Sequence, residues 1–594
     1  MMSQPPSLRP ASTTRPSLTG RFGMASSSHW LATASAQAVL ERGGNAFDAA
    51  VAGGFVLQVV EPNLNGPAGE LVGIFSSAQE RVTRVLAGVG PAPIAASIEW
   101  FHDHGFNSVP GSGTLATTTP GQFDAWMLLL LDYGTWELAD VLQFAIDYAR
   151  DGFPVTASIH ATLSDVAPLL REHWPTSAAA WLCDGAVPEV GSILFNTEYA
   201  RVLEKLIEVG DQASSRASRI EAARTQWSTG FIAKSIAEFV KVPSWQPSGQ
   251  PTAGLLSPGD LADYRAQYEL PVCVEFRGRT IAKAGAWTQG PALAQILLML
   301  EKYSNDELDP STPRGIHLIL ETTKLAMADR DGYFGDLNAP IESLLADDYI
   351  LKRLALIGAT ASAELRPGDV PGFTAYHPPL QEGAGGEVTP HKAPEPSHTR
   401  GDTCQLDVVD QWGNMIAVTP SGGWLQSSPL IPGLGFALNS RLQQSWLDKS
   451  SPSRLQGGKR PRVTLTPTLV LQGNEPIVAL GSPGGDGQDQ WQLQYLLRTI
   501  VCGYTPQEAI DAPAFLSQAF PESFWPRTWV KSGVSIEGRM DEDVCAELVR
   551  LGHRVTIVGD WSLGRLSVVT RDPETGLLGA AANPRGAQGY ASGR

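Results

Sequence analysis

The feature that most limits how this chain folds is a segment unable to form a packed core, followed at once by a β-hairpin. Residues 378–402 are rich in Pro, Gly, His and charged residues and have almost no large apolar side chain. That composition is typical of a linker. Directly behind it, residues 404–409 alternate as a strand, 410–414 form a turn with Gly413-Asn414, and 415–419 return as a second strand. The chain therefore divides at residue 402 into a large segment, 29–402, and a small segment, 403–594.

Helical blocks alternate with further hairpins on both sides of this boundary. Apolar periodicity predicts helices over 30–60 with a break at Gly43-Gly44, over 121–149 and 197–206, and an amphipathic helix over 315–330. Alternation predicts a hairpin over 71–75 and 82–86, and another over 464–471 and 477–480. The second hairpin leads into the loop 481–485 and then into helices over 490–501 and 506–512. This order favours helices packed in layers on antiparallel sheets.

Length and charge exclude several functional classes. At 594 residues the chain holds several domains or one large layered unit. A formal charge of −17, without a dense basic run, disfavours a nucleic-acid partner. The longest apolar run, 125–131, is too short to span a membrane.

The beginning of the chain and the cysteines bear on where the protein acts. Residues 1–28 are rich in Ser, Pro and Thr and lack a signal-like apolar stretch, so we expect a disordered leader. The five cysteines have no CxxC spacing, which suits free thiols in a reducing compartment. A cytoplasmic location is therefore expected.

The common catalytic motifs are missing from the sequence. We find no G-x-S-x-G elbow, no H-E-x-x-H helix and no phosphate-binding glycine loop. His102 and His104 have the His-x-His form of a metal pair, but they lie in a polar turn without a second ligand cluster. A solvated turn is the simpler interpretation, and neither a metal nor a cofactor is expected.

Thr403 stands at the boundary between linker and strand. If the Asp402–Thr403 bond is cut, Thr403 gains an α-amino group with a pKa of about 8 beside its own hydroxyl, which supplies a base and a nucleophile in one residue. Thr at a strand start is otherwise an ordinary β-former. Its neighbour Cys404 is expected to be a small buried residue rather than a redox thiol. Gly484-Gly485 is able to direct two backbone N–H groups at one oxygen, as an oxyanion hole requires, although such pairs are also simple turns.

These residues fall within a longer pattern that resembles the gamma-glutamyltransferase family. The matching runs are Gly43-Gly44-Asn45-Ala46-Phe47-Asp48-Ala49-Ala50, Val60-Glu61-Pro62, Gly254-Leu255-Leu256, Lys324-Leu325-Ala326, Ala328-Asp329-Arg330, Val408-Val409-Asp410 with Gly413-Asn414, and Gly481-Ser482-Pro483-Gly484-Gly485. The resemblance implies an α+β fold, the four-layer αββα sandwich of the N-terminal-nucleophile hydrolases, with antiparallel sheets.

The same resemblance implies roles for particular residues. Thr403 would be the nucleophile, Gly484 and Gly485 the oxyanion hole, and Thr419 and Ser421 the hydroxyls that assist processing. The large and small chains would remain associated as one intertwined domain. Whether that unit dimerises further is left open by the sequence.

The departures from the family concern the subsite for a glutamyl group. The arginine that holds the glutamyl carboxylate is absent around Val89, where residues 88–93 read Gly-Val-Gly-Pro-Ala-Pro. Gln444 stands at the position of the aspartate that receives the amino group, Gly423 at that of an asparagine, and Val463 at that of a serine, while Thr464 keeps a hydroxyl. Because each lost charge-assisted bond costs about 1.5–3 kcal/mol, a glutamyl end should bind poorly.

Arg441 offers a replacement, since it lies in the same segment as Gln444. It could bind the carboxylate of a dicarboxylic half-amide, or it could be an ordinary salt-bridged arginine.

Three functions compete on this reading. The leading one is an autoprocessing threonine amidohydrolase that transfers a small or medium acyl group from an amide to water, as in the oxamate-hydrolysing and dicarboxyl-acylase branches of the family. The second is a gamma-glutamyl hydrolase or transpeptidase with a rebuilt subsite. The third is an inactive homologue that only binds.

Overall fold

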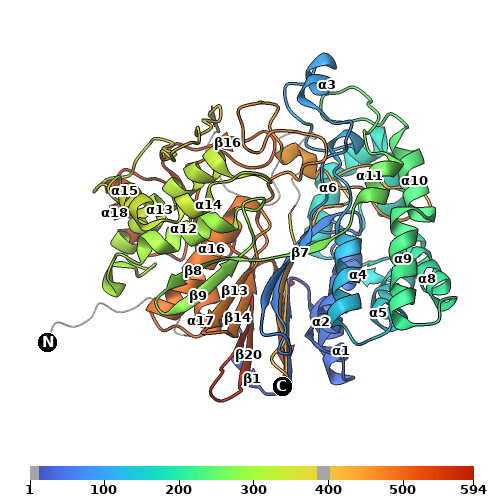
Figure 1. Ribbon diagram of the computed structural model, residues 1–594, viewed down its shortest axis with the longest axis horizontal. Coiled ribbons are helices and arrows are strands. Elements are labelled where there is room, and N and C mark those ends of the chain that lie inside the picture. The colour runs from blue at the N-terminus through green and yellow to red at the C-terminus, as the bar shows by residue number, and fades with distance from the viewer. Residues whose placement is uncertain (1–11, 384–401) are drawn as a thin grey trace.

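Two sheets lie face to face at the centre of the protein, and helices cover the outer face of each (Figure 1). The computed structural model describes residues 12–383 and 402–594. Every strand pairing within these two seven-stranded sheets is antiparallel. The predicted α+β fold, a four-layer αββα sandwich, is confirmed.

The first sheet, which we call sheet I, carries the hairpin that follows Thr403. Its strand order is β21-β2-β11-β12-β3-β4-β7. The bounds are β2 Gly23–Ser27, β3 Glu70–Ser76, β4 Thr83–Gly88, β7 Gln267–Glu269, β11 Leu406–Asp410, β12 Met415–Ser421 and β21 Tyr590–Gly593. The β11–β12 turn needs glycine, because Gly413 has a φ of 92°.

The second sheet, sheet II, has the order β1-β20-β19-β14-β13-β9-β8. Its strands are β1 Leu18–Gly20, β8 Val272–Phe276, β9 Arg279–Lys283, β13 Thr468–Gln472, β14 Glu475–Gly481, β19 Ser567–Arg571 and β20 Leu578–Ala582. Both sheets combine strands from before and after Thr403, so the two segments of the chain share one core.

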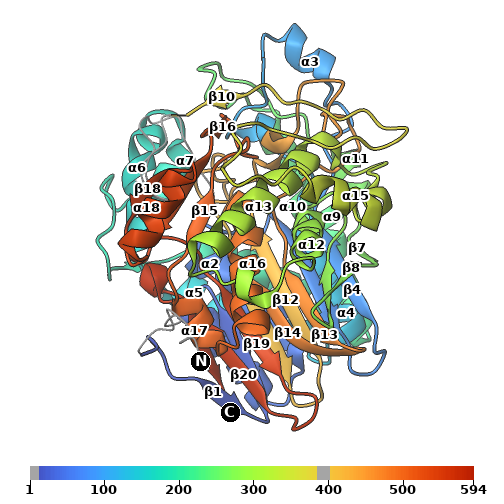
Figure 2. The same cartoon turned by 90° about the vertical axis from the view of Figure 1, so that its left-hand side faces the viewer.

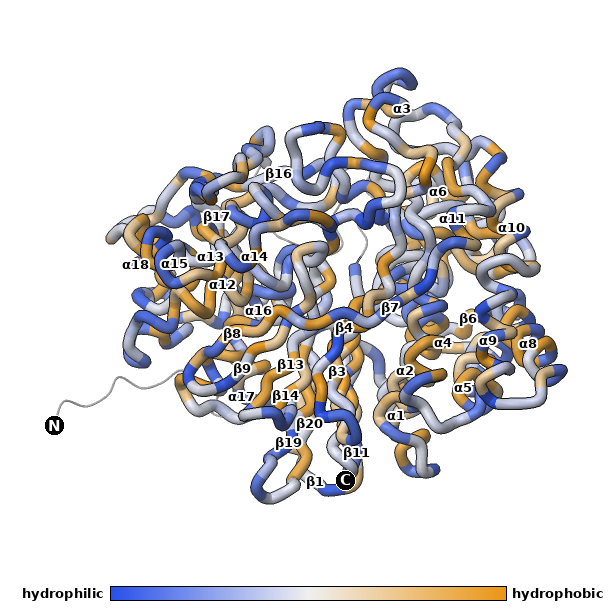
Figure 3. Tube along the Cα trace, in the orientation of Figure 1, coloured by the Kyte–Doolittle hydropathy of each residue, from blue (hydrophilic) through white to orange (hydrophobic). Residues whose placement is uncertain are grey.

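Apolar side chains fill the space between the sheets and the space under each helical layer. The inter-sheet cluster contains Met24, Val72 and Ala417 from sheet I and Ala282, Leu469 and Val569 from sheet II. Figure 3 shows this concentration of hydrophobic residues along the central strands. Alternate strand residues point to opposite faces, so strands such as β2, β11 and β12, in which every residue is buried, contact the other sheet on one face and the helices on the other.

The helical layer on sheet I includes α1 Trp30–Glu41, α2 Ala46–Val60, α4 Gln122–Tyr133, α5 Leu138–Asp151, α8 Thr197–Asp211 and α9 Arg216–Ser228. The predicted break at Gly43 separates α1 from α2. Asn45 then caps α2: its side chain accepts from the Asp48 backbone N at 3.0 Å, and the Asp48 carboxylate accepts from the Asn45 backbone N at 3.0 Å.

The helical layer on sheet II includes α12 Gly290–Leu300, α13 Pro313–Tyr333, α16 Gln488–Leu496, α17 Pro506–Asp511 and α18 Glu542–Arg550 (Figure 2). The helix predicted over 315–330 is present, but its predicted amphipathic character is wrong, because every residue of α13 from Gly315 to Tyr333 is buried. Its charged residues are compensated by ion pairs instead of by water: Glu321 with Lys324, and Asp329 with Arg353 at 3.2 Å.

The disordered leader predicted over 1–28 is also wrong where the structure describes it. Gly23–Ser27 form β2, a fully buried strand between β21 and β11, and Leu18–Gly20 form β1 at the edge of sheet II. Small hydroxyl residues fit there because their side chains are satisfied inside the protein. Ser26 Oγ donates to the Ala581 carbonyl at 2.8 Å, for example. Residues 1–11 lie outside the described part of the chain.

The predicted linker is partly ordered. Gln381–Glu382 form β10, which pairs in parallel with β16, Thr528–Trp529. Residues 384–401 lie outside the described ranges. None of the helices in those ranges is long and apolar enough to cross a bilayer.

Candidate active site

Thr403 is held at the end of the β11–β12 hairpin rather than inside a regular strand. It forms an isolated antiparallel bridge with Ser421, the last residue of β12, and β11 begins only at Leu406. The strand predicted over 404–409 therefore starts two residues too early. The Cys404 backbone N donates to the Pro420 carbonyl at 3.0 Å, which fixes this register. Thr403 is 3% exposed.

Ser421 connects the two sides of the Asp402–Thr403 bond. Its Oγ lies 2.9 Å from the Asp402 carbonyl oxygen, to which it donates, and 3.2 Å from Thr403 Oγ1. A hydroxyl has one proton to donate, so the Thr403 hydroxyl donates to Ser421 while Ser421 donates to the carbonyl. This arrangement polarises the Asp402 carbonyl directly beside the Thr403 hydroxyl.

Arg441 supports Ser421 and is closed to a substrate carboxylate. The guanidinium donates from Nη2 to Ser421 Oγ at 2.9 Å and is ion-paired with Glu70. The Arg441 side chain is 1% exposed. Burial raises the pKa of the Glu70 carboxyl, and Arg441 opposes that rise. The hypothesis of a substrate-binding Arg441 is thus corrected: a buried guanidinium requires a partner inside the protein, and Glu70 is that partner.

Thr419 contacts Gln405, which lies two residues after Thr403. Its Oγ1 donates to Gln405 Oε1 at 2.6 Å, and Gln405 in turn donates to Asp407 at 2.7 Å. Gln405 also touches the glycine loop, since a Cβ placed on Gly481 would lie 2.2 Å from Gln405 Oε1. Thr419 therefore positions the chain beside Thr403 and the start of the loop.

The loop after β14 requires glycine at both predicted oxyanion positions. Gly484 has a φ of 116° and Gly485 a φ of 53°, in the left-handed region. A Cβ on Gly484 would lie 2.2 Å from the Trp491 ring, whereas one on Gly485 would lie 3.4 Å from Phe524. The Phe524 ring lies under the Arg441 guanidinium at 5.5 Å. The loop therefore lies beside the group formed by Ser421, Arg441 and Glu70, which we call the Ser421 cluster.

Arg330 of α13 fastens the same loop. It is ion-paired with Asp486, which follows Gly485, and donates to Gln289 Oε1 at 3.2 Å. Gln289 Nε2 donates to the Gly485 carbonyl at 3.3 Å. Although burial raises the pKa of Asp486, Arg330 and the hydrogen bonds from Ser523 lower it overall. Asp486 therefore stays ionised and the loop stays anchored.

The remaining predicted substrate residues differ in their surroundings. Within the described residues, Gln444 Nε2 and Thr464 Oγ1 are buried polar atoms without a hydrogen-bond partner. Gln444 Oε1 accepts from Arg441 at 3.4 Å, so it belongs to the Ser421 cluster. Val89 packs in the inter-sheet cluster with Val463 and Trp287, and is a core residue instead of a substrate contact.

Three partner residues at this site, Glu70, Arg330 and Arg565, were not predicted to belong to it, although Arg330 falls within one of the matching runs. Glu70 and Arg441 are 371 residues apart, and Arg330 and Asp486 are 156 apart. Arg565, which is ion-paired with Asp402, is equally remote. Long-range pairs of this kind cannot be found from spacing.

Two other clusters lie away from Thr403. His102 lies in the last turn of the helix α3, Ile98–Asp103, and not in the predicted polar turn, and the ring of His104, which follows the helix, stacks on Trp100. Elsewhere His317, Glu321 and His553 are close enough to share a cation, but the imidazoles hydrogen-bond each other at 3.0 Å and Glu321 is paired with Lys324. These contacts satisfy the cluster internally.

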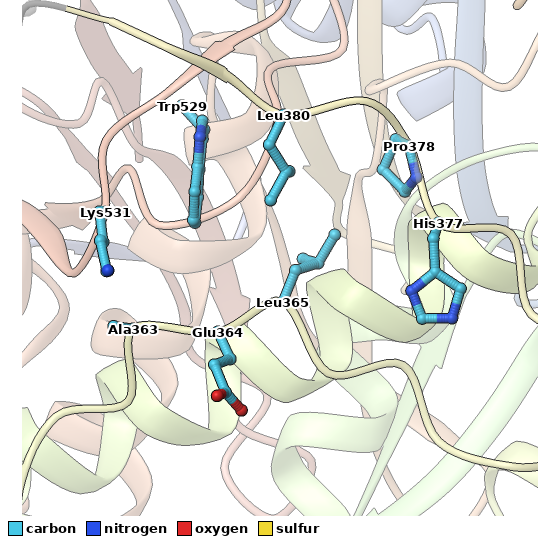
Figure 4. Close-up of a pocket in the computed structure, with 8 residues that line it drawn as sticks. All are labelled: Ala363, Glu364, Leu365, His377, Pro378, Leu380, Trp529 and Lys531. Carbon is cyan, nitrogen blue, oxygen red and sulfur yellow. The ribbon is translucent and has the colours of Figure 1, made fainter.

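A surface cavity of about 450 Å³ opens where β10 meets β16 (Figure 4). It is lined by Ala363, Glu364, Leu365, His377, Pro378, Leu380, Trp529 and Lys531. None of the residues around Thr403 lines this cavity, so it is separate from the candidate active site.

Cys404 is buried and inert. Its Sγ donates to Glu61 Oε2 at 3.0 Å, and burial raises the pKa of the thiol well above its ordinary value. The thiol is protonated and serves packing.

An αββα sandwich with a buried threonine ahead of a central hairpin defines the class of N-terminal-nucleophile amide hydrolases. Residues 32–593 match the family described as gamma-glutamyltranspeptidase, and the chain belongs to that family.

Similar proteins extend this assignment. An oxamate amidohydrolase proenzyme of Klebsiella pneumoniae is 30% identical, covering 96% of this chain and 98% of its own. A glutathione hydrolase-like YwrD proenzyme of Bacillus subtilis is 28% identical with the same coverage. The solved structure of LmbA2991HD is 46% identical, covers 98% of this chain and 100% of its own, and has a TM-score of 0.93. The chain is accordingly an autoprocessing amide hydrolase of the family.

Proposed function

We propose that the chain cleaves its own Asp402–Thr403 bond and that Thr403, the new N-terminus, is the nucleophile that hydrolyses an acyl amide. The observation that carries this proposal is the position of Ser421 Oγ, 2.9 Å from the Asp402 carbonyl oxygen and 3.2 Å from Thr403 Oγ1. One hydroxyl thus contacts the bond to be cut and the attacking group.

Processing begins with attack of Thr403 Oγ1 on the Asp402 carbonyl carbon. The carbonyl oxygen becomes an oxyanion that accepts a hydrogen bond from the Ser421 hydroxyl. Arg441 donates to Ser421 Oγ and so makes this hydroxyl more acidic. The peptide C–N bond then breaks, the Thr403 nitrogen takes the proton that the Thr403 hydroxyl released on attack, and an ester joins the Asp402 carbonyl carbon to Thr403 Oγ1. Water hydrolyses this ester, which leaves an Asp402 carboxylate and a free Thr403 α-amino group.

Substrate hydrolysis repeats these steps with an external amide. The α-amino group, with a pKa of about 8, accepts the Thr403 hydroxyl proton as Oγ1 attacks the acyl carbon. We assign the backbone N–H groups of Gly484 and Gly485 to the oxyanion, since their left-handed conformations turn this loop beside Ser421. The amine leaves with the proton, and water releases the acid from the Thr403 ester.

Intact mass of the purified protein tests the nucleophile without a substrate. Wild type should give fragments of about 43 and 20 kDa, in proportion to the 63.5 kDa chain, the smaller beginning at Thr403. Thr403→Ala should give one intact chain, and Thr403→Ser should still cleave because it keeps the hydroxyl. Cleavage of the alanine variant would refute the assignment. An uncleaved wild type with no amidase activity would support an inactive binding homologue.

The acyl group is proposed to be small and to lack the glutamyl amino-acid end, with water as acceptor. Support comes from Val89, which packs in the core where the family has its carboxylate-binding arginine, and from the relative named oxamate amidohydrolase. The competing substrate is a gamma-glutamyl amide, favoured by the relative named glutathione hydrolase-like. Faster turnover of a chromogenic gamma-glutamyl anilide than of oxamate and succinamate would favour the competitor.

A further inference from the structure

The Asp402 carboxylate makes two contacts, a hydrogen bond with the neighbouring backbone and an ion pair with an arginine. Its Oδ1 accepts from the Thr403 backbone N at 2.9 Å, and its Oδ2 is ion-paired with Arg565. The Arg565 side chain is 24% exposed and that of Asp402 20%, so solvent reaches the pair. Asp402 is the acyl component of the bond that processing breaks. Arg565 therefore binds the side chain of an acyl group in the precursor.

Arg565 lies between the scissile bond and the oxyanion loop. Its backbone N donates to Ser482 Oγ at 3.3 Å, and Ser482 precedes Gly484 by two residues. The guanidinium thus belongs to a segment attached to the loop that would stabilise the substrate oxyanion. This connection places a permanent positive charge beside the acyl group.

Cleavage removes the partner of Arg565. Among the described residues Asp402 is the one carboxylate in ion-pair contact with it. Glu61 is near enough to oppose the effect of burial on the pKa of Arg565, but its carboxylate already accepts from Ser28, Cys404 and Gln588. Once Asp402 becomes a chain end that is no longer bonded to Thr403, the guanidinium can lose its direct ion-pair partner and keep only the more distant Glu61 carboxylate.

We infer that Arg565 is a specificity-determining residue that binds the carboxylate of the substrate's acyl group in place of Asp402. The inference rests on the proposed function, because it requires cleavage before Thr403. In Asp402 the side-chain carboxylate is separated from the acyl carbon by two carbons, as in a succinyl group. The substrate class is accordingly the half-amides of short dicarboxylic acids, with a succinamate spacing the closest match.

Hydrolysis of succinamate and of the neutral analogue butyramide, normalised to cleaved protein, tests the assignment. Arg565→Gln should lower kcat/KM for succinamate about 10- to 100-fold while leaving butyramide within about twofold, since one charge-assisted contact is lost. Arg565→Lys should fall between, because it keeps the charge but not the planar fork. Arg571→Gln is the matched control, since Arg571 pairs with Glu475 at 3.0 Å on β19 and should change neither rate.

Asp402→Asn separates recognition in the precursor from recognition in the mature enzyme. This variant should cleave more slowly, yet its mature form should keep the wild-type ratio of the two rates, because Asp402 has left the site. Equal losses for both amides in Arg565→Gln, or failure of both Arg565 variants to cleave, would overturn the inference. An uncleaved wild type would instead overturn the proposed function.

Discussion

The two long buried helices, α2 on sheet I and α13 on sheet II, are shielded from water by different means. In α2 every residue is buried, and its polar side chains are only Asp48 and Gln58. In α13 the buried stretch also contains Glu321, Lys324, Asp329, Arg330 and Asp331. The first helix is held by apolar packing and the second by a set of compensated charges.

This difference corresponds to their relation to the active site. α2 packs on β11 and supports the hairpin behind Thr403 from its apolar face. α13 reaches the Gly484-Gly485 loop, to which we assign the oxyanion hole, through the ion pair of Arg330 with Asp486. Apolar contacts stabilise a layer but have no preferred angle. An arginine with several hydrogen-bonded partners fixes the position of one loop.

The largest effect should follow from breaking that link in α13. Within the described part of the chain, Arg330→Met removes the ion-pair partner of Asp486 and leaves Asp331 with only Arg462 at 3.5 Å, which costs about 3–5 kcal/mol. Displacement of the loop should also reduce kcat by about 100-fold or more. Denaturant unfolding and amide hydrolysis check both. Arg314→Met on the same helix is the control, because its pair with Glu307 is exposed and worth less than about 1 kcal/mol.

Removing packing from α2 should cost stability without changing chemistry. Phe55→Ala truncates a fully buried ring, and the free energy of unfolding should fall by about 3–5 kcal/mol. The kcat of the folded, cleaved fraction should stay within about twofold, because no side chain at the active site loses a partner. A loss of kcat comparable to that of Arg330→Met would erase the contrast between the layers.

Acid should weaken the α13 layer through His553, whose Nε2 contacts His317. Burial lowers the pKa of His553 to about 3, so between pH 6.5 and 3 the proton binds the unfolded chain preferentially. This contribution to stability is complete above pH 6.5 and is lost as pH falls, at about 1.4 kcal/mol per pH unit. Wild type should therefore lose stability more steeply than His553→Asn between pH 6 and 4.5. Parallel pH profiles would contradict the prediction.

The smallest effect is expected where α2 meets β11. A Cβ on Gly53 would lie 3.0 Å from Leu406 Cδ2 and 3.3 Å from the Ala32 carbonyl oxygen. Overpacking of about 1–3 kcal/mol is partly offset by the gain of about 1 kcal/mol for alanine in a helix, so Gly53→Ala should destabilise by about 1 kcal/mol. Thermal unfolding would measure this change. A stabilised variant would show that the Leu406 side chain moves aside at little cost.

Local patterns predicted most elements near the site. The alternation around Gly413-Asn414 identified β11 and β12, and the β14 loop was located from its glycines, since turns need residues that tolerate positive φ. Patterns failed where burial and not period determined the outcome. Gly23–Ser27 have no apolar run yet form a buried strand inside sheet I, and α13 has polar residues yet no exposed face beyond its first turn.

The candidate site divides in the same way. Thr403 and Ser421 were predicted as catalytic residues together with Thr419, Gly484 and Gly485, and the Thr403 and Ser421 hydroxyls lie 3.2 Å apart because both residues belong to the same hairpin region. Arg441 was predicted near substrate, but its partner Glu70 comes from β3 on the other side of the chain division. A charge's role depends on its partner, which sequence spacing does not supply.

The sequence by itself determined most of the helices and hairpins near the site, the change of composition ahead of Thr403 and the family, because these depend on period, turn chemistry and residue order. Only the tertiary structure decided which buried charges meet. Arg441 with Glu70, Arg330 with Asp486 and Arg565 with Asp402 each join remote segments. A charge removed from water is stable only beside its counter-ion, so its function is set by the neighbours that folding provides.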